Sequence, residues 1–157
     1  MIPKPCEKVH FSHRELPYLY QSVVMSELIK IYLLTAVLFF AIDLLWLGVI
    51  AKDFYNKHLG RLFRERVNWA AATIFYLLYI LGIMIFAVLP GIESASLGHT
   101  ALLGVLYGLF TYATYDLTNL ATLKDWPKVV VVVDIVWGMF LCGIVSAGGF
   151  LAATHLI

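Results

Sequence analysis

The sequence has little charge. Only 13% of its 157 residues are charged and 62% are hydrophobic, whereas about 25% of the residues in soluble domains are charged. This composition excludes a water-soluble globular protein. The formal net charge of +1 also excludes a basic surface large enough to follow a nucleic acid backbone, so we expect no nucleic-acid partner.

The sequence also lacks clustered cysteines and a signal peptide. Its two cysteines, Cys6 and Cys142, lie far apart, and no Cys/His spacing typical of a metal site is present. We therefore predict neither a disulfide nor a metal site, and the cofactors stay unknown. The first 24 residues have no apolar core of the kind that a signal peptide needs. We predict a poorly ordered N-terminal tail over residues 1–27, and translation from Met25 is an equal alternative.

Long apolar stretches dominate what remains. Four of them reach or approach the roughly 20 residues that a helix needs to cross about 30 Å of hydrocarbon. They cover residues 28–51, 69–89, 97–123 and 129–157. We therefore predict an all-α, polytopic membrane protein with a single domain over residues 28–157, folded as a bundle of four transmembrane helices.

Lysine and arginine predict the orientation of these spans. Four spans place both termini on one side of the membrane and residues 52–66 and 124–128 on the other. The second side carries more lysine and arginine than the first. Because positively charged connections stay in the cytoplasm, we expect both termini outside it.

The connection between spans 1 and 2 has the pattern of an amphipathic helix. Its apolar side chains recur at the spacing of one helical face, and its cations lie on the opposite face. The apolar positions are Tyr55, Leu59, Leu62 and Phe63. We predict a short interfacial helix among the lipid head groups, with its basic face toward anionic lipid. The alternative is that the first span continues as a helix into water.

Spans 2 to 4 differ in what they offer for packing. Residues 69–89 contain no charge and are followed by Pro90, so we expect this span to face lipid and to end at the proline. Spans 3 and 4 carry small residues at nearly four-residue spacing, which lets two helices approach closely. They are Gly104 and Gly108 in span 3, and Gly138, Cys142, Ser146 and Gly149 in span 4.

An aspartate interrupts three of the four apolar stretches. Counted at 1.5 Å per residue from the nearest lysine on the cytoplasmic side, Asp43, Asp116 and Asp134 lie about 13, 12 and 9 Å deep. A carboxylate that faces lipid costs about 2.5–3.5 kcal/mol, so we expect the three acids to meet inside the bundle. Mutual repulsion and burial would then favour binding of a proton or a cation.

Further polar and aromatic residues lie at the same depth. Asn119 and Tyr112 share a helical face with Asp116, and Tyr115 lies on the adjacent stripe with several threonines. We expect the threonine hydroxyls to bond back to their own helix and to be structural.

The pattern Asp-x-x-Trp occurs twice, as "DLLW" ending at Trp46 and as "DIVW" ending at Trp137. An indole can donate a hydrogen bond to a carboxylate or offer its face to a cation, although Trp46 could equally be an interfacial anchor. The predicted substrate- or ion-binding residues are Asp43, Asp116, Asp134, Asn119, Tyr112, Tyr115, Trp46 and Trp137. Catalytic residues stay unknown.

These motifs carry a family resemblance. With "AIDLLWLG", "FYNKHLG", "YGLFTYATYDLTNLATLKDWP" and "DIVWG", the chain resembles a bacterial membrane protein family classified as domain of unknown function 2177. The resemblance covers most of the chain from Met25 onward. It implies the multi-pass architecture and the bacterial inner (plasma) membrane, and it implies no particular reaction.

Three functions fit the acidic layer, and the sequence leaves open whether the protein is an enzyme. The first is proton- or small-cation-linked transport, with membrane lipid around the chain and a homodimer expected because one four-helix chain is small for a pathway. The second is a membrane-embedded enzyme acting on lipid or isoprenoid head groups, with the acids as general acid/base groups or ligands of a divalent ion. The third is an accessory membrane subunit with a purely structural acidic cluster.

Overall fold

The computed structural model describes the backbone of residues 16–155 and the side chains of residues 24–155. Helix α1 (Leu16–Leu45) continues into a five-residue π-helix, η1 (Trp46–Ile50). Residues 1–15 of the predicted tail lie outside the described residues, whereas the rest of that tail is the beginning of α1. The first helix therefore starts earlier than the predicted span at residue 28.

The predicted amphipathic connection is helical, but part of its apolar face packs on protein. The chain breaks from helical geometry at Ala51, and α2 (Lys52–Leu59) and the 3₁₀ turn η2 (Gly60–Leu62) follow. Leu59 is buried in a cluster with Trp126 and Val130. The predicted helix is therefore present, with Leu59 of its apolar face packed on protein, and its place among the lipid head groups stays a prediction. The alternative of a straight continuation into water does not match the break at Ala51.

The second long helix is continuous past its proline. It consists of α3 (Trp69–Ile83), the π-helix η3 (Met84–Val88) and α4 (Leu89–Glu93). Pro90 occupies the first turn of α4, where its missing N–H costs little, and the π-helical segment before it adjusts the hydrogen-bond ladder. The expectation that this span ends at Pro90 is therefore wrong by one helical turn.

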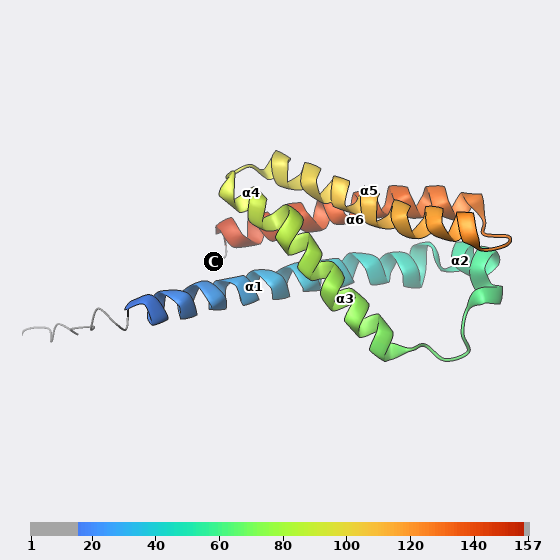
Figure 1. The fold of residues 1–157 in the computed structure, drawn as a ribbon, viewed down its shortest axis with the longest axis horizontal. Coiled ribbons are helices and arrows are strands. Elements are labelled where there is room, and N and C mark those ends of the chain that lie inside the picture. The colour runs from blue at the N-terminus through green and yellow to red at the C-terminus, as the bar shows by residue number, and fades with distance from the viewer. Residues whose placement is uncertain (1–15, 156–157) are drawn as a thin grey trace, which may run out of the picture.

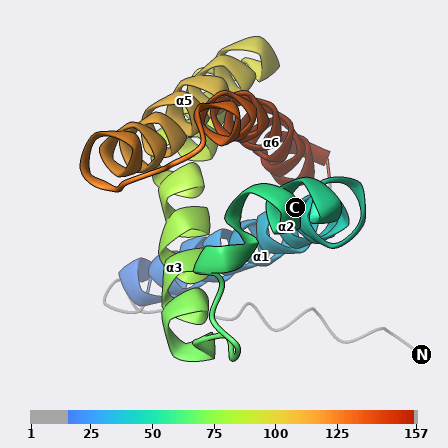
Figure 2. The ribbon, with the colours of Figure 1, turned by 90° about the vertical axis from the view of Figure 1, so that its right-hand side faces the viewer.

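Helices α5 (Leu97–Thr122) and α6 (Lys128–His155) run side by side in opposite directions (Figures 1 and 2). A Cβ added to Gly108 would collide with the backbone of Gly138, and one added to Gly104 would collide with the backbone of Cys142. Gly104, Gly108, Gly138, Cys142 and Ser146 thus lie at this contact, whereas Gly149 packs against Thr35 and Val88; the predicted role of these small residues in packing is confirmed.

Within the described residues, three helical stretches are long and apolar enough to cross a membrane. They are Val24–Ile50, Trp69–Glu93 and Lys128–His155. Helix α5 has 26 residues, which is sufficient length, but its threonines, tyrosines and other polar residues make it less apolar than these three. The structure therefore supports an all-helical membrane protein with three candidate spans in its described part. It does not confirm α5 as the predicted fourth span.

The ends of the helices are sorted between the two ends of the bundle. The described start of α1, α4 and the end of α6 lie toward one end of the molecule, and α2 lies toward the opposite end with the connection between α5 and α6 (Figure 1). At that second end, Arg61 lies 3.9 Å from the carboxylate of Asp125.

Helix α3 crosses the others at an angle (Figures 1 and 2). Its second half is buried in the main core, where Ile80 and Ile83 are fully covered beside Leu141 of α6. Its first half is exposed, and Trp69 is 74% exposed. This helix therefore meets the bundle closely only along part of its length.

Candidate functional site

Two of the three predicted acids share one cavity. Asp43 of α1 and Asp134 of α6 line a space of about 170 Å³, which we call the acid cavity. Asp43 is only 4% exposed, and Asp134 is partly buried. The other residues lining the acid cavity are Phe39, Leu47, Tyr55, Phe75, Tyr76, Tyr112 and Trp137.

Each of these carboxylates accepts a hydrogen bond from a tyrosine of another element. Tyr76 of α3 donates to Oδ2 of Asp43 over 3.2 Å. Tyr55 of α2 donates to Oδ1 of Asp134 over 2.5 Å, and the indole Nε1 of Trp46 donates to the Tyr55 oxygen over 3.2 Å. Five helical segments, namely α1, η1, α2, α3 and α6, therefore supply side chains to these hydrogen bonds.

Tyr55 is held in its neutral form. Burial and the neighbouring Asp134 both raise the pKa of Tyr55 above its ordinary value, whereas the hydrogen bond from Trp46 lowers it. A phenol that keeps its proton acts as a donor toward the carboxylate. Two successive hydrogen bonds thus link these side chains: the indole of Trp46 donates to Tyr55, and Tyr55 donates to Asp134.

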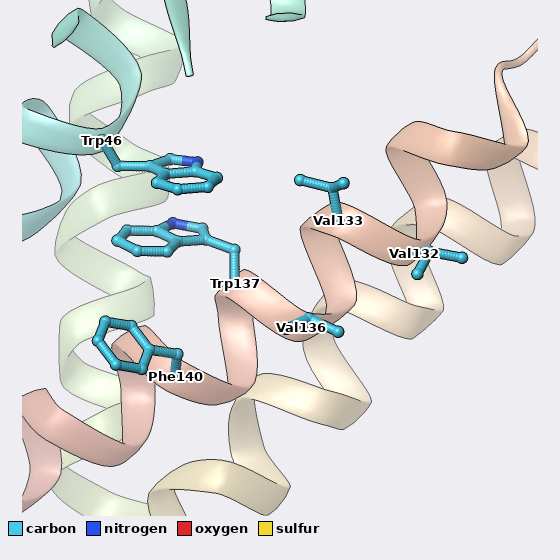
Figure 3. A pocket seen from close by; sticks show the side chains of 6 residues that line it. All are labelled: Trp46, Val132, Val133, Val136, Trp137 and Phe140. Carbon is cyan, nitrogen blue, oxygen red and sulfur yellow. The ribbon is translucent and has the colours of Figure 1, made fainter. Parts of the chain in front are cut away.

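The two Asp-x-x-Trp motifs interlock. The rings of Trp46 and Trp137 are stacked, with centroids 4.2 Å apart and planes at 8° (Figure 3). Trp46 reaches Asp134 through Tyr55, while Trp137 lies against Asp43 without the geometry of a hydrogen bond. Because α1 and α6 run in opposite directions, each tryptophan lies near the acid of the other motif.

The outer side of this stack faces an apolar groove. The groove has a volume of about 470 Å³, and Figure 3 shows its lining side chains. They are Trp46, Val132, Val133, Val136, Trp137 and Phe140. Trp137 lines both this groove and the acid cavity, so its indole lies between the two spaces.

The third predicted acid, Asp116, lies near Asp134 but outside the acid cavity. Asp116 of α5 is fully buried, and neither of its carboxyl oxygens has a hydrogen-bond partner among the residues that the structure describes. The Trp126 indole lies nearby without hydrogen-bond geometry, and Asp134 is close enough to repel Asp116 electrostatically. Asp116 lines neither the acid cavity nor the side cavity described next. The three acids thus lie in one region, but they do not surround a single pocket.

A second space opens between α3 and α5. This side cavity has a volume of about 390 Å³ and contacts the acid cavity through Asp134, Tyr112 and Phe75, which line both. Its remaining lining residues are Tyr79, Thr111 and Tyr115. Two of its lining residues, Phe75 and Tyr115, are 52% and 59% exposed, so the side cavity has a mouth at the surface. The predicted residues Tyr112 and Tyr115 therefore both line the side cavity.

The remaining predictions about Asn119 and the threonines have different outcomes. Asn119 is partly buried on α5 but lines neither cavity. Thr111, Thr118 and Thr122 each donate a hydrogen bond to a carbonyl of their own helix. The predicted hydrogen bonds of these threonines to their own helix are confirmed, although Thr111 also lines the side cavity. No group of three potential ligands that could hold a metal ion occurs in the described part of the chain.

Sequence reasoning missed several aromatic residues at the site. Tyr76 and Tyr79 lie three positions apart on α3, where they bond to Asp43 and to Thr111 respectively. They are the two phenols in an uncharged, apolar span, and this was the available signal. Trp126, in the connection between α5 and α6, covers Asp116, and no helical periodicity could place it.

These features define a class: an all-helical membrane protein with acids and tyrosines gathered between its long apolar helices. The family model described as "Predicted membrane protein (DUF2177)" matches residues 28–151, and the chain belongs to this family. No curated protein and no solved structure gave a match.

Proposed function

We propose that this chain is a transporter linked to protons or to a small cation, with Asp43 and Asp134 as the binding carboxylates. The observation that carries the proposal is that these two acids, from different helices, line one cavity and each accept a tyrosine hydrogen bond. Burial among apolar side chains makes the charged form of each carboxylate costly. A bound proton or cation relieves that cost, and its release restores it.

The proposal includes α5 as a fourth span. This helix runs beside α6 and meets it through Gly104 and Gly108, so a membrane crossed by α6 would surround α5 as well. The back-bonded threonines satisfy their own hydroxyls, which lowers the cost of placing them in lipid. Four spans would put both termini on one side, and the excess of cations at the other end favours termini outside the cytoplasm.

Asp116 has a different part in this proposal. Its buried carboxyl group lacks hydrogen-bond partners among the described residues, and a charge in such a place is costly. We assign it a proton that is held while the acid cavity is charged. Its proximity to Asp134 would couple the two groups, so that the charge on one disfavours the charge on the other.

A second candidate function is an enzyme that acts on a lipid or isoprenoid head group. The observation in its favour is the side cavity, because a lateral opening between two helices would admit such a molecule from the bilayer. Asp134 would then be the general acid or base. A three-carboxylate site for a divalent ion is not supported, because the three aspartates do not form a group that could hold a metal within the described residues.

Reconstituted vesicles test the transport proposal. The purified protein is placed in liposomes with a pH gradient, and internal pH is followed with a fluorescent dye in sodium, potassium and choline buffers. We expect wild-type vesicles to dissipate the gradient faster than empty vesicles, and Asp134→Asn to abolish this difference. Asp125→Asn, at an exposed acid outside both cavities, is the matched control. Equal rates in empty and wild-type vesicles in every buffer, with head-group turnover in lipid extracts, would favour the enzyme.

A further inference from the structure

The side cavity is too large and too aromatic to be a site for protons alone. Its volume of about 390 Å³ is many times the roughly 30 Å³ that one water occupies, and it falls within the range of small-molecule pockets. Four of its lining side chains are aromatic, namely Phe75, Tyr79, Tyr112 and Tyr115. A cargo that fills it must therefore carry apolar surface.

The ionisable groups of the cavity also restrict the charge of its ligand. Asp134 is the ionisable carboxyl group in its lining, and no lysine, arginine or histidine lines either cavity in the part of the chain that the structure describes. Asp43 adds a second acid in the connected acid cavity. These groups repel anions and favour a positively charged ligand.

Aromatic rings around a carboxylate also favour one kind of cation. Ring faces attract ammonium groups, especially substituted ones, which hold their water less tightly than a metal ion does. The rings of Tyr79 and Tyr112, which both line the side cavity, have centroids 6.2 Å apart and planes at 83°.

We propose that the side cavity binds a monovalent organic cation, a substituted ammonium group attached to an apolar body. The ammonium group lies at Asp134, and the apolar body lies between the rings of Phe75, Tyr79 and Tyr115. The mouth between α3 and α5 allows entry from the lipid phase. This inference rests on the same site as the proposed transport function, and it adds the substrate class.

Calorimetric titration of the full chain in a nonionic detergent at pH 8 tests this class. The probe is benzyltrimethylammonium, which has both a ring and a fixed positive charge. Benzyl alcohol has the ring alone, tetramethylammonium has the charge alone, and benzenesulfonate has a ring with negative charge. We expect the probe to bind at least tenfold more tightly than each of the other three.

Two variants with matched controls locate the binding. Asp134→Asn is expected to weaken the probe's affinity at least tenfold, and Asp125→Asn to leave it unchanged. Phe75→Leu is expected to weaken it at least threefold, whereas Phe110→Leu, at another exposed phenylalanine, leaves it unchanged. Since Phe75 is half exposed, its variant keeps the fold even if Asp134→Asn does not. Wild-type affinity in Phe75→Leu, or equal binding of benzyl alcohol, would overturn the inference.

The outcome separates this inference from the transport proposal. Binding of the probe without any gradient-driven flux in vesicles would retain the cation site and reject transport. Proton flux that depends on Asp134, together with no binding of the probe, would retain transport and reject the cation site.

Discussion

Tyr55 donates a hydrogen bond of 2.5 Å to Asp134, although 79 positions separate the two residues in the sequence. This bond ties the short helix α2 to the long helix α6. It also places a neutral phenol against one of the two carboxylates of the acid cavity. The connection between the first two long helices is therefore part of the site, and it can be tested by removing single groups.

Removal of the Tyr55 hydroxyl should destabilise the protein. Tyr55→Phe leaves Asp134 without its donor and Trp46 without its acceptor, at a cost of about 1–3 kcal/mol. Tyr115→Phe removes a phenol from an exposed ring and should change stability little. Thermal unfolding in detergent, followed by circular dichroism, measures both. A melting temperature for Tyr55→Phe equal to that of the wild type would contradict the role of this bond.

The stacked indoles should be energetically coupled. In a double-mutant cycle, Trp46→Leu and Trp137→Leu should show a coupling of about 0.5–1.5 kcal/mol, because the rings lie 4.2 Å apart. Trp46→Leu paired with Trp69→Leu is the control cycle, since Trp69 is 74% exposed on another helix. Chemical unfolding in mixed micelles gives the free energies. Additive effects in the first cycle would show that the stack is not a stabilising contact.

The close approach of α5 and α6 should not tolerate a side chain at its centre. Gly108→Val places carbon atoms against the backbone of Gly138 and is expected to destabilise the pair by at least about 1–3 kcal/mol. Gly98→Val is the matched control, since a Cβ at Gly98 meets nothing within 4 Å. Expression level and melting temperature report the difference. Equal stability of the two variants would mean that the helices are not in contact at Gly108.

We expect the buried carboxyl group of Asp116 to lower the stability of the protein and to be needed for transport. Asp116→Leu removes a polar group that has no hydrogen-bond partner among the described residues, so we expect it to keep or raise the melting temperature. The same variant should lose most of the gradient-driven flux. A large loss of stability would instead mean that Asp116 acts as structural glue between helices.

Much of the architecture follows from the sequence. Apolar length predicts the long helices, and the spacing of Gly104 and Gly108 predicts a helix contact because small residues have few other uses at that spacing. The depth of the acids in the chain predicts that all three come together; Asp43 and Asp134 line one cavity, whereas Asp116 does not line it. Each of these signals is local or depends only on counting along a helix.

Other features depend on how helices tilt and turn, which local patterns do not encode. Tyr76 reaches Asp43 because α3 crosses the bundle at an angle, and the turn at Ala51 brings Tyr55 back over α6. The continuation of the second helix through Pro90 depends on the π-helical segment before it. Asn119 shares a face with Asp116 by periodicity but lines neither cavity, because the residues of α5 that line the side cavity, from Thr111 to Tyr115, precede it in the helix.

The shared use of one cavity by Asp43 and Asp134 is tested most directly by a double-mutant comparison of flux in vesicles. Initial rates of gradient dissipation are measured for wild type, Asp43→Asn, Asp134→Asn and the double variant at equal protein density. If the two acids act as one site, each single variant loses at least tenfold in rate and the double variant is no slower than the slower single one. Wild-type rates in either single variant, or losses that multiply in the double variant, would contradict a shared site.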